Sequence, residues 1–255
     1  MKKVILITGA SAGLGEEFAF QLAAQGFSLL LVARREEKLQ QIHTQIIAKY
    51  PDISVFYLSV DLSNPQGAQQ IVTYIKNNAL LLKGLINNAG FGQRGAFSEI
   101  ALSRQMAMLQ VNINSLVSLT HLAIPLLKEQ KNSFIINVAS TAAFQAGPNL
   151  AIYYASKAFV LSFSQALYEE LKGENIQVST LCPGATNTEF IQLAQMPQST
   201  LFKLRVMEKQ PVVRYALANT NKALVIPGLL NKFSVLFVQL VPRSWARKLA
   251  YLVQK

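Results

Sequence analysis

A tyrosine and a lysine four positions apart, Tyr153 and Lys157, are the residues best suited to acid–base chemistry. On a helix this spacing places both side chains on one face, one turn apart. A free tyrosine, with a pKa near ~10, transfers protons poorly at neutral pH, and an adjacent ammonium favours its ionised form. Tyr154 lies three positions before Lys157, so helical geometry alone leaves either tyrosine eligible. Alternatively, both tyrosines pack against a sheet as core residues.

The segment from Thr8 to Gly15, TGASAGLG, stands between the first expected strand and the first expected helix. Glycines there let the backbone turn tightly and approach a pyrophosphate, whose charge the free N–H groups and the helix dipole favour. Glycine also marks ordinary turns, so the position directly after a strand favours a dinucleotide site. We expect the contacts to come from Gly9, Ser11, Ala12, Gly13, Leu14 and Gly15.

The end of the second expected strand, Val32-Ala33-Arg34-Arg35, bears on which dinucleotide binds. An acid about 20 residues beyond the glycines selects NAD, whereas an arginine there accommodates the 2′-phosphate of NADP. From the end of this strand, no carboxylate appears until Glu36. A guanidinium pairs well with phosphate, and Ser11 could add a hydroxyl donor. We therefore predict NADP(H), with NAD less favoured. The alternative is two solvated arginines at the start of a helix.

Apolar runs of strand length alternate with longer segments of helical period, a pattern typical of a parallel sheet covered on both faces. Crossovers between parallel strands are right-handed, so this order predicts an α/β, doubly wound sheet in a single domain, residues 1–255. The expected strands are residues 3–8, 28–33, 54–60, 84–86, 133–138, 177–182 and 223–226, and the expected helices are residues 14–25, 36–50, 65–78, 103–130 and 151–172.

Four further segments extend the pattern: Asn87-Asn88-Ala89-Gly90, Asn112, Ser140 and Tyr153 to Lys157. Together with the glycine segment, their order and spacing resemble the short-chain dehydrogenase/reductase family. The resemblance covers about residues 3 to 188, and TGxxxGxG is similar to its compact, single-domain branch. It implies a Rossmann fold and hydride transfer between a nicotinamide cofactor and a carbonyl or alcohol.

The resemblance also implies a role for each catalytic candidate. Tyr153, rather than Tyr154, would be the general acid in reduction or the base in oxidation, because the family spacing is four residues. Lys157 would also hold the nicotinamide ribose. Ser140 would hydrogen-bond the substrate oxygen as charge develops on it. Asn112, within the long helix, would hold a water that links Lys157 to solvent.

The same resemblance implies further cofactor contacts. Asp61 and Leu62 would contact the adenine. Asn88, Ala89 and Gly90 would bring the backbone close to the cofactor. Asn87 would brace the central strand. A last group, which would contact the nicotinamide amide and the phosphates, comprises Pro183, Gly184, Thr186 and Thr188. Cys182 is interpreted as a small buried hydrophobe rather than a nucleophile.

The substrate is predicted to be a lipophilic ketone, aldehyde or 3-oxoacyl compound. Residues 144–190, and those after Pro227, are similar to members grouped with long-chain ketoacyl and hydroxysteroid reductases. A second hypothesis is a non-catalytic NADP-binding module that regulates a protein partner, since fold alone does not imply activity. Residues that either line an apolar pocket or belong to the core are Phe91, Gly92, Phe97, Phe144, Phe190 and residues 191–196.

Composition narrows the class of protein. The chain is 51% apolar and 15% charged, which argues against disorder. One cysteine, Cys182, and two distant histidines, His43 and His121, supply no metal site and fit a reducing compartment. The first apolar run, Val4 to Ile7, is short for a signal peptide, and no run reaches the roughly 18 apolar residues of a membrane span. We expect a cytoplasmic protein.

Positive charge gathers at the C-terminal end, where residues 201–255 carry ten Lys or Arg against one acid, Glu208. We expect a mobile substrate cover over residues 188–222 and a basic helical extension over residues 228–255. Trp245 and several Phe and Leu recur there at helical spacing among the cations, so the extension lies on a membrane surface, on its own domain or on a second subunit. No nucleic-acid motif accompanies the charge. Relatives commonly form dimers or tetramers through helices 103–130 and 151–172, which implies a homo-oligomer.

Overall fold

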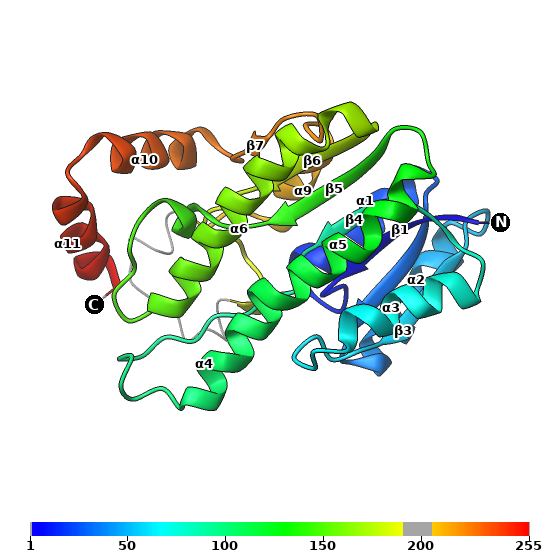
Figure 1. Ribbon diagram of the computed structural model, residues 1–255, viewed down its shortest axis with the longest axis horizontal. Coiled ribbons are helices and arrows are strands. Elements are labelled where there is room, and N and C mark those ends of the chain that lie inside the picture. Colours follow the sequence, from blue (N-terminus) through cyan, green and yellow to red (C-terminus); the bar gives the residue numbers. More distant parts are fainter. Residues whose placement is uncertain (1, 191–205, 255) are drawn as a thin grey trace.

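Seven parallel strands form one sheet in the computed structural model, which describes residues 2–190 and 206–254 (Figure 1). Neighbouring strands follow the order β3-β2-β1-β4-β5-β6-β7. This arrangement confirms the predicted doubly wound α/β sheet, a Rossmann fold. The strands are β1 (Lys3–Thr8), β2 (Ser28–Ala33), β3 (Val55–Ser59), β4 (Leu81–Asn87), β5 (Ser133–Val138), β6 (Ile176–Leu181) and β7 (Leu224–Val225).

Helices cover both faces of this sheet. On one face lie α1 (Gly13–Ala24), α2 (Glu36–Lys49) and α9 (Lys209–Leu217). On the other lie α3 (Gly67–Asn77), α5 (Ser115–Lys128) and α6 (Ala151–Glu170). The other α-helices of the described residues are α4 (Leu102–Leu109), α10 (Leu229–Leu240) and α11 (Arg243–Gln254), and short 3-10 turns lie at Thr141–Phe144 and Lys172–Glu174.

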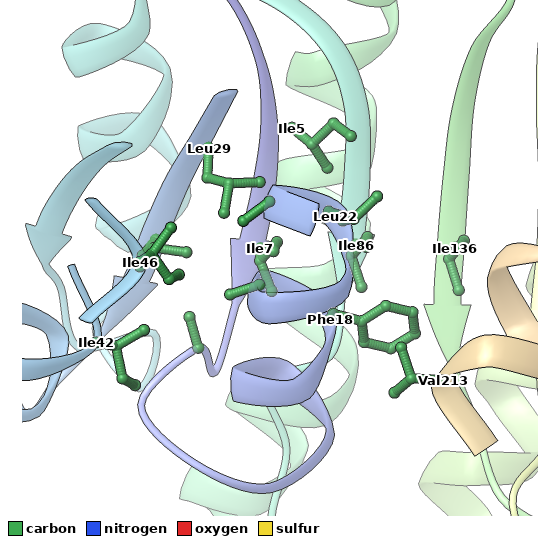
Figure 2. Packing of buried hydrophobic residues seen from close by; sticks show 14 of the residues in the cluster. Ile5, Ile7, Phe18, Leu22, Leu29, Ile42, Ile46, Ile86, Ile136 and Val213 are labelled. Carbon is green, nitrogen blue, oxygen red and sulfur yellow. The ribbon is translucent and has the colours of Figure 1, made fainter. Parts of the chain in front are cut away.

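The strands are buried on both faces because their apolar residues alternate between two cores. Ile5 and Ile7 of β1 point toward Phe18 and Leu22 of α1, as Figure 2 shows. Val4 and Leu6 pack in the other core, with residues of α3, α5 and α6. Near-continuous apolar runs are what a parallel sheet with helices on both sides requires. This burial accounts for the agreement between expected and observed strands.

The segment predicted as one helix over residues 103–130 is interrupted. Between α4 and α5 the chain forms a π-helical turn, Gln110–Asn114, which contains Asn112. Such turns inside α-helices are often found at functional sites. Among the described residues, only the stretch Leu102–Lys128 is long and apolar enough by composition to cross a membrane. Its residues Leu119, Ala123 and Leu127 are buried against the sheet, as expected of a core helix.

The strand order places the crevice for a ligand. The chain order reverses between β1 and β4, and ligands of doubly wound sheets bind outside the carboxyl ends of the strands at this switch point. The turn from Thr8 into α1 and the segment after Asn87 both lie at this edge. Segments that are distant in the sequence therefore meet there.

The C-terminal part forms the helices that its prolines predict. Pro211 lies in the first turn of α9, α10 follows Pro227 and Gly228, and α11 begins after Pro242. Helix α9 belongs to the layer on the sheet, where Lys209 forms an ion pair of 2.7 Å with Glu16 of α1. Residues 191–205 lie outside the described residues, so motion of a cover over residues 188–222 stays a prediction.

Candidate active site

A cavity of about 1090 Å³ runs along the carboxyl ends of the strands. The glycine segment lies on its wall, as do Tyr153 and Ser140. Gly15 and Asn112 do not line it, although both support residues that do. The predicted residues that share this cavity are Gly9, Ser11, Ala12, Gly13, Leu14, Arg34, Arg35, Asp61, Leu62, Asn88, Ala89, Gly90, Ser140, Tyr153, Lys157, Pro183, Gly184, Thr186 and Thr188.

The glycine segment is packed so closely that side chains would not fit. Gly9 has a φ of +64°, and a Cβ there would stand 2.9 Å from the Ala89 Cα. A Cβ on Gly15 would overlap the Gly9 carbonyl oxygen. The Thr8 hydroxyl accepts hydrogen bonds from the backbone N–H groups of Asn88, at 3.1 Å, and Ala89, at 3.0 Å. The turn therefore offers bare backbone to the cavity, which fits a dinucleotide pyrophosphate.

Arg35 is held over this turn by two partners. Its Nε and Nη2 donate to the Ser11 hydroxyl at 3.2 and 3.1 Å, and its Nη1 pairs with a Glu189 carboxylate oxygen at 2.9 Å. Arg34 also lines the cavity. Both side chains of the Arg35–Glu189 pair are nearly half exposed, so the pair can exchange with a bound anion at little cost.

Asp61 marks the end of the cavity beyond the glycine segment. Burial alone would raise the pKa of its carboxyl, but hydrogen bonds from Ser63 and the nearby charge of Arg34 outweigh it and lower the pKa. The carboxylate accepts a bond of 2.9 Å from the Ser63 backbone N–H. A charged acceptor thus stands beside Leu62 on the cavity wall.

Tyr153 of α6 turns its ring into the cavity and is 6% exposed. Burial raises the pKa of this phenol above its ordinary value, and a hydrogen bond with the Ser140 side chain acts in the opposite direction. The Phe190 ring lies 5.3 Å from the Tyr153 ring, centroid to centroid. Tyr154 also lines the cavity, but its ring packs over Gly147, where a Cβ would overlap it.

Lys157 lies one turn further along α6 and is almost fully buried. Its ammonium donates a hydrogen bond of 2.8 Å to the Val138 carbonyl and stands 5.9 Å from the centroid of the Tyr153 ring. Burial lowers the pKa of this lysine to about 8. The expected lowering of the tyrosine pKa by this ammonium does not outweigh burial in this structure, so the phenol is protonated at neutral pH.

Asn112 supports the cavity wall beside Lys157. Its amide donates to the Phe91 carbonyl and to the Ser156 hydroxyl, both at 3.0 Å, and accepts from the Phe91 N–H at 3.0 Å. A Cβ on Gly90 would lie 3.1 Å from the Asn112 oxygen and 3.4 Å from the Lys157 nitrogen. The π-helical turn thus brings Asn112 to the same narrow space as Lys157.

The neighbouring central strands are held by a buried amide pair. Asn87 donates to Asn137 at 2.8 Å and to Thr120 at 2.9 Å, and Asn137 donates to Ser164 at 2.9 Å. The predicted bracing role of Asn87 is confirmed. Cys182 is fully buried and burial raises its pKa to about 12, which confirms the interpretation of this thiol as a small hydrophobe.

The segment after β6 closes the other side of the cavity. Thr186 donates to the Gly184 carbonyl at 3.0 Å, and Thr188 donates to the Thr186 carbonyl at 3.2 Å. A Cβ on Gly184 would overlap the side chain of Asn231, which belongs to α10. The absence of a side chain at Gly184 therefore lets α10 approach the site.

Sequence reasoning missed what α10 and α11 contribute to the cavity. These residues are remote in the chain, and their apolar spacing left a membrane surface, the same domain and a second subunit open, so no local signal placed them at the site. Glu189, the partner of Arg35, was missed because 154 positions separate the two residues. The missed lining residues include Glu189, Leu230, Asn231, Phe233, Ser234, Val235, Phe237, Val238 and Ala250.

Of the aromatic residues proposed for an apolar pocket, Phe91, Phe144 and Phe190 line the cavity. Phe97 does not: it is 61% exposed, because it precedes α4 at the protein surface. Residues 191–196 lie outside the described residues. In residues 2–190 and 206–254, no three His, Cys, Asp or Glu side chains are grouped so that they could hold a metal ion.

A glycine-lined turn lies at the switch point of a doubly wound sheet, with a buried tyrosine and lysine and a half-buried serine beside it. This arrangement defines a dinucleotide-binding class of oxidoreductase. Residues 3–198 match the short chain dehydrogenase family. The chain belongs to this family.

Three similar proteins show the range of relatives. The 11-beta-hydroxysteroid dehydrogenase 1A of Arabidopsis thaliana is 35% identical over 74% of this chain, which spans 54% of that relative's length. The very-long-chain 3-oxoacyl-CoA reductase of Mycosarcoma maydis is 29% identical over 96% of this chain and 72% of its own. A short-chain dehydrogenase from Sphingobium yanoikuyae, solved in complex with NADPH, has a TM-score of 0.82 at 30% identity, covering 92% of both chains.

Proposed function

We propose that this protein is an NADP(H)-dependent oxidoreductase that reduces lipophilic carbonyl compounds, with Tyr153 as the proton donor. The observation that carries the proposal is the shared cavity: the buried Tyr153 and Lys157 and the half-buried Ser140 line the space that extends to the glycine segment and to Arg35. A module that only senses cofactor needs no proton donor, so this set favours catalysis.

The residues of the chain divide the work of a reduction. When bound, the nicotinamide cofactor exchanges hydride with the substrate carbon. Tyr153 donates its proton to the carbonyl oxygen, and the Ser140 hydroxyl donates a hydrogen bond to the same oxygen as negative charge develops. Lys157 stabilises the phenolate that remains and contributes a donor toward the cofactor ribose. The raised pKa of Tyr153 supports reduction, because the phenol is protonated at neutral pH.

A lipophilic substrate is supported by the walls of the cavity beyond Tyr153. Phe91, Phe144 and Phe190 lie on one part of the wall, and Phe233 and Val238 of α10 lie on another. Aromatic and aliphatic walls bury apolar substrate surface and leave few polar groups to orient the reactive oxygen. The hydroxysteroid and very-long-chain 3-oxoacyl names of two relatives point to the same substrate class.

Replacing Arg35 should change the choice of cofactor. We expect Arg35→Ala to weaken NADPH binding roughly 10- to 100-fold, because a charge-assisted contact to the 2′-phosphate is lost. NADH affinity should be unchanged, since that cofactor lacks the phosphate. Calorimetric titration of both cofactors measures the two affinities, and Arg214→Ala, an exposed arginine of α9, is the control. Equal weakening of NADPH and NADH would contradict the assignment.

Cofactor affinity should also depend on pH through Lys157. Its pKa is about 8 in the free protein, so the ammonium is present below that pH and lost above it. We expect NADPH affinity to fall roughly tenfold as pH rises through this value, because a charged donor becomes neutral. Lys157→Arg stays charged across the range and should remove the fall. If the NADPH affinity of the wild-type protein stays constant as pH rises through about 8, the expected pH dependence is refuted.

The proposed function is tested by measuring the loss of NADPH absorbance with a panel of aldehydes, long-chain ketones, hydroxysteroid ketones and 3-oxoacyl thioesters. We expect oxidation with lipophilic ketones and little with short, water-soluble ones. Oxidation confined to short polar substrates would contradict the substrate class. A homo-oligomer formed through α4–α5 and α6, and a cytoplasmic location, stay predictions.

A further inference from the structure

Helices α10 and α11 carry a broad exposed apolar surface, which we call the C-terminal apolar patch. We propose that this patch docks on an anionic membrane surface and that the cavity receives its substrate from that surface. The second part rests on the proposed function. The patch consists of Leu229, Leu230, Phe233, Leu236, Phe237, Leu240, Trp245, Tyr251 and Leu252.

The side chains of this patch are too exposed for a surface that packs against its own domain. Its side chains are between 41% (Tyr251) and 76% (Leu240) exposed, and α10 has one buried residue, Val235. Figure 1 shows α10 and α11 at the outer edge of the molecule, away from the layers of the sheet. Contiguous exposed apolar surface of this kind marks an interaction site.

Charge around the patch identifies its partner. Lys232, Arg243, Arg247 and Lys248 are all exposed, and α10 and α11 contain no Asp or Glu. A second copy of the chain would bring these like charges together. An anionic lipid surface instead pairs with the cations and accepts the apolar side chains, and tryptophan favours the interface between them.

The same helix connects the patch to the cavity. Leu230, Phe233 and Phe237 are largely exposed and also line the cavity, while Asn231 packs on Gly184 at the site. The wall of the cavity and the docking surface therefore share residues of one helix. A lipophilic carbonyl compound dissolved in the bilayer would reach Tyr153 along α10 without crossing bulk water, where its apolar surface is unfavourable.

Trp245 makes docking directly measurable, because it is the only tryptophan in the chain and is 69% exposed. The full chain is mixed with vesicles of equal parts phosphatidylglycerol and phosphatidylcholine, or of phosphatidylcholine alone. We expect flotation with the anionic vesicles, a blue shift of Trp245 emission and quenching by brominated lipid. Failure of the wild-type chain to float with anionic vesicles would overturn the proposal and leave the proposed function untouched, since flotation requires no turnover.

Matched variants separate the apolar and charged contributions. Leu240→Asp should weaken vesicle binding at least about tenfold, whereas Leu102→Asp, on α4 and 70% exposed, should not. The double reversal Arg247→Glu with Lys248→Glu should weaken binding at least about tenfold. Reversal of two exposed lysines elsewhere, Lys49 and Lys76, is its control. Equal binding by all variants would overturn the assigned surface.

Turnover tests the route of the substrate. Leu240→Asp should slow reduction of a water-insoluble ketone supplied in anionic vesicles and leave reduction of a water-soluble ketone unchanged, because Leu240 does not line the cavity. Equal effects on both substrates would contradict delivery from the bilayer. If light scattering shows that Leu240→Asp separates a dimer of the wild-type chain, the patch binds a second copy and the membrane proposal is wrong.

Discussion

Tyr153→Phe is expected to reduce turnover at least about a thousandfold and to leave NADPH affinity within about threefold of wild type. The phenol hydroxyl forms a hydrogen bond with the Ser140 side chain. General-acid catalysis contributes roughly 10²- to 10⁴-fold to a rate. Phenylalanine keeps the ring that packs against Phe190, so the shape of the cavity should persist. Steady-state kinetics with a reactive ketone, together with calorimetric titration of NADPH, measures both effects.

The adjacent tyrosine provides the matched control for this change. Tyr154 lies on the same helix and lines the same cavity, but its ring packs over Gly147. Tyr154→Phe should therefore retain most of the turnover. Full activity of Tyr153→Phe, or an equal loss from Tyr154→Phe, would show that the proton donor is another group.

Gly15→Ala is expected to weaken NADPH binding about a hundredfold and to lower the free energy of unfolding by roughly 1–3 kcal/mol. A Cβ there meets the Gly9 carbonyl group, which is backbone of the turn, and the side-chain amide of Asn88. The backbone has to shift, and the N–H groups that would face the phosphates shift with it. Thermal unfolding and NADPH titration report the two consequences separately.

A glycine in open surroundings serves as the control for this prediction. Gly173 lies after α6, and a Cβ there would meet no atom within 4 Å. Gly173→Ala should change stability by less than about 0.5 kcal/mol and NADPH affinity not at all. Unchanged NADPH affinity in Gly15→Ala would remove the glycine segment from the cofactor site.

The sheet was predictable because each strand is an apolar run bounded by turns. A short run that is apolar throughout is typical of a strand in a parallel sheet covered by helices on both faces. β1, β2 and β5 have the predicted bounds. β4 begins three residues earlier than expected because Lys83 interrupts its apolar pattern. Its ammonium reaches the surface, where the Asn132 carbonyl accepts a hydrogen bond of 2.8 Å.

The π-helical turn at Gln110–Asn114 was not predictable from periodicity, since one extra residue in a turn leaves the apolar pattern of the flanking helices intact. The pairing of Arg35 with Glu189 was equally hidden, because 154 positions separate the two residues. The approach of α10 to Gly184 depends on how the chain returns after β7. Motifs can be recognised from the order of residues, whereas contacts between remote residues form only when the helices and strands pack together.

The central claim is that the cavity beside Tyr153 performs hydride transfer, and isotope transfer tests it most directly. The protein is incubated with NADPH deuterated at the transferable position and a lipophilic ketone, and the alcohol product is analysed by mass spectrometry. We predict an alcohol with one deuterium at the carbinol carbon from wild type, formed at least about a thousandfold more slowly by Tyr153→Phe. Tight NADPH binding without deuterium in the product of any ketone, aldehyde or thioester would contradict catalysis and favour a regulatory module.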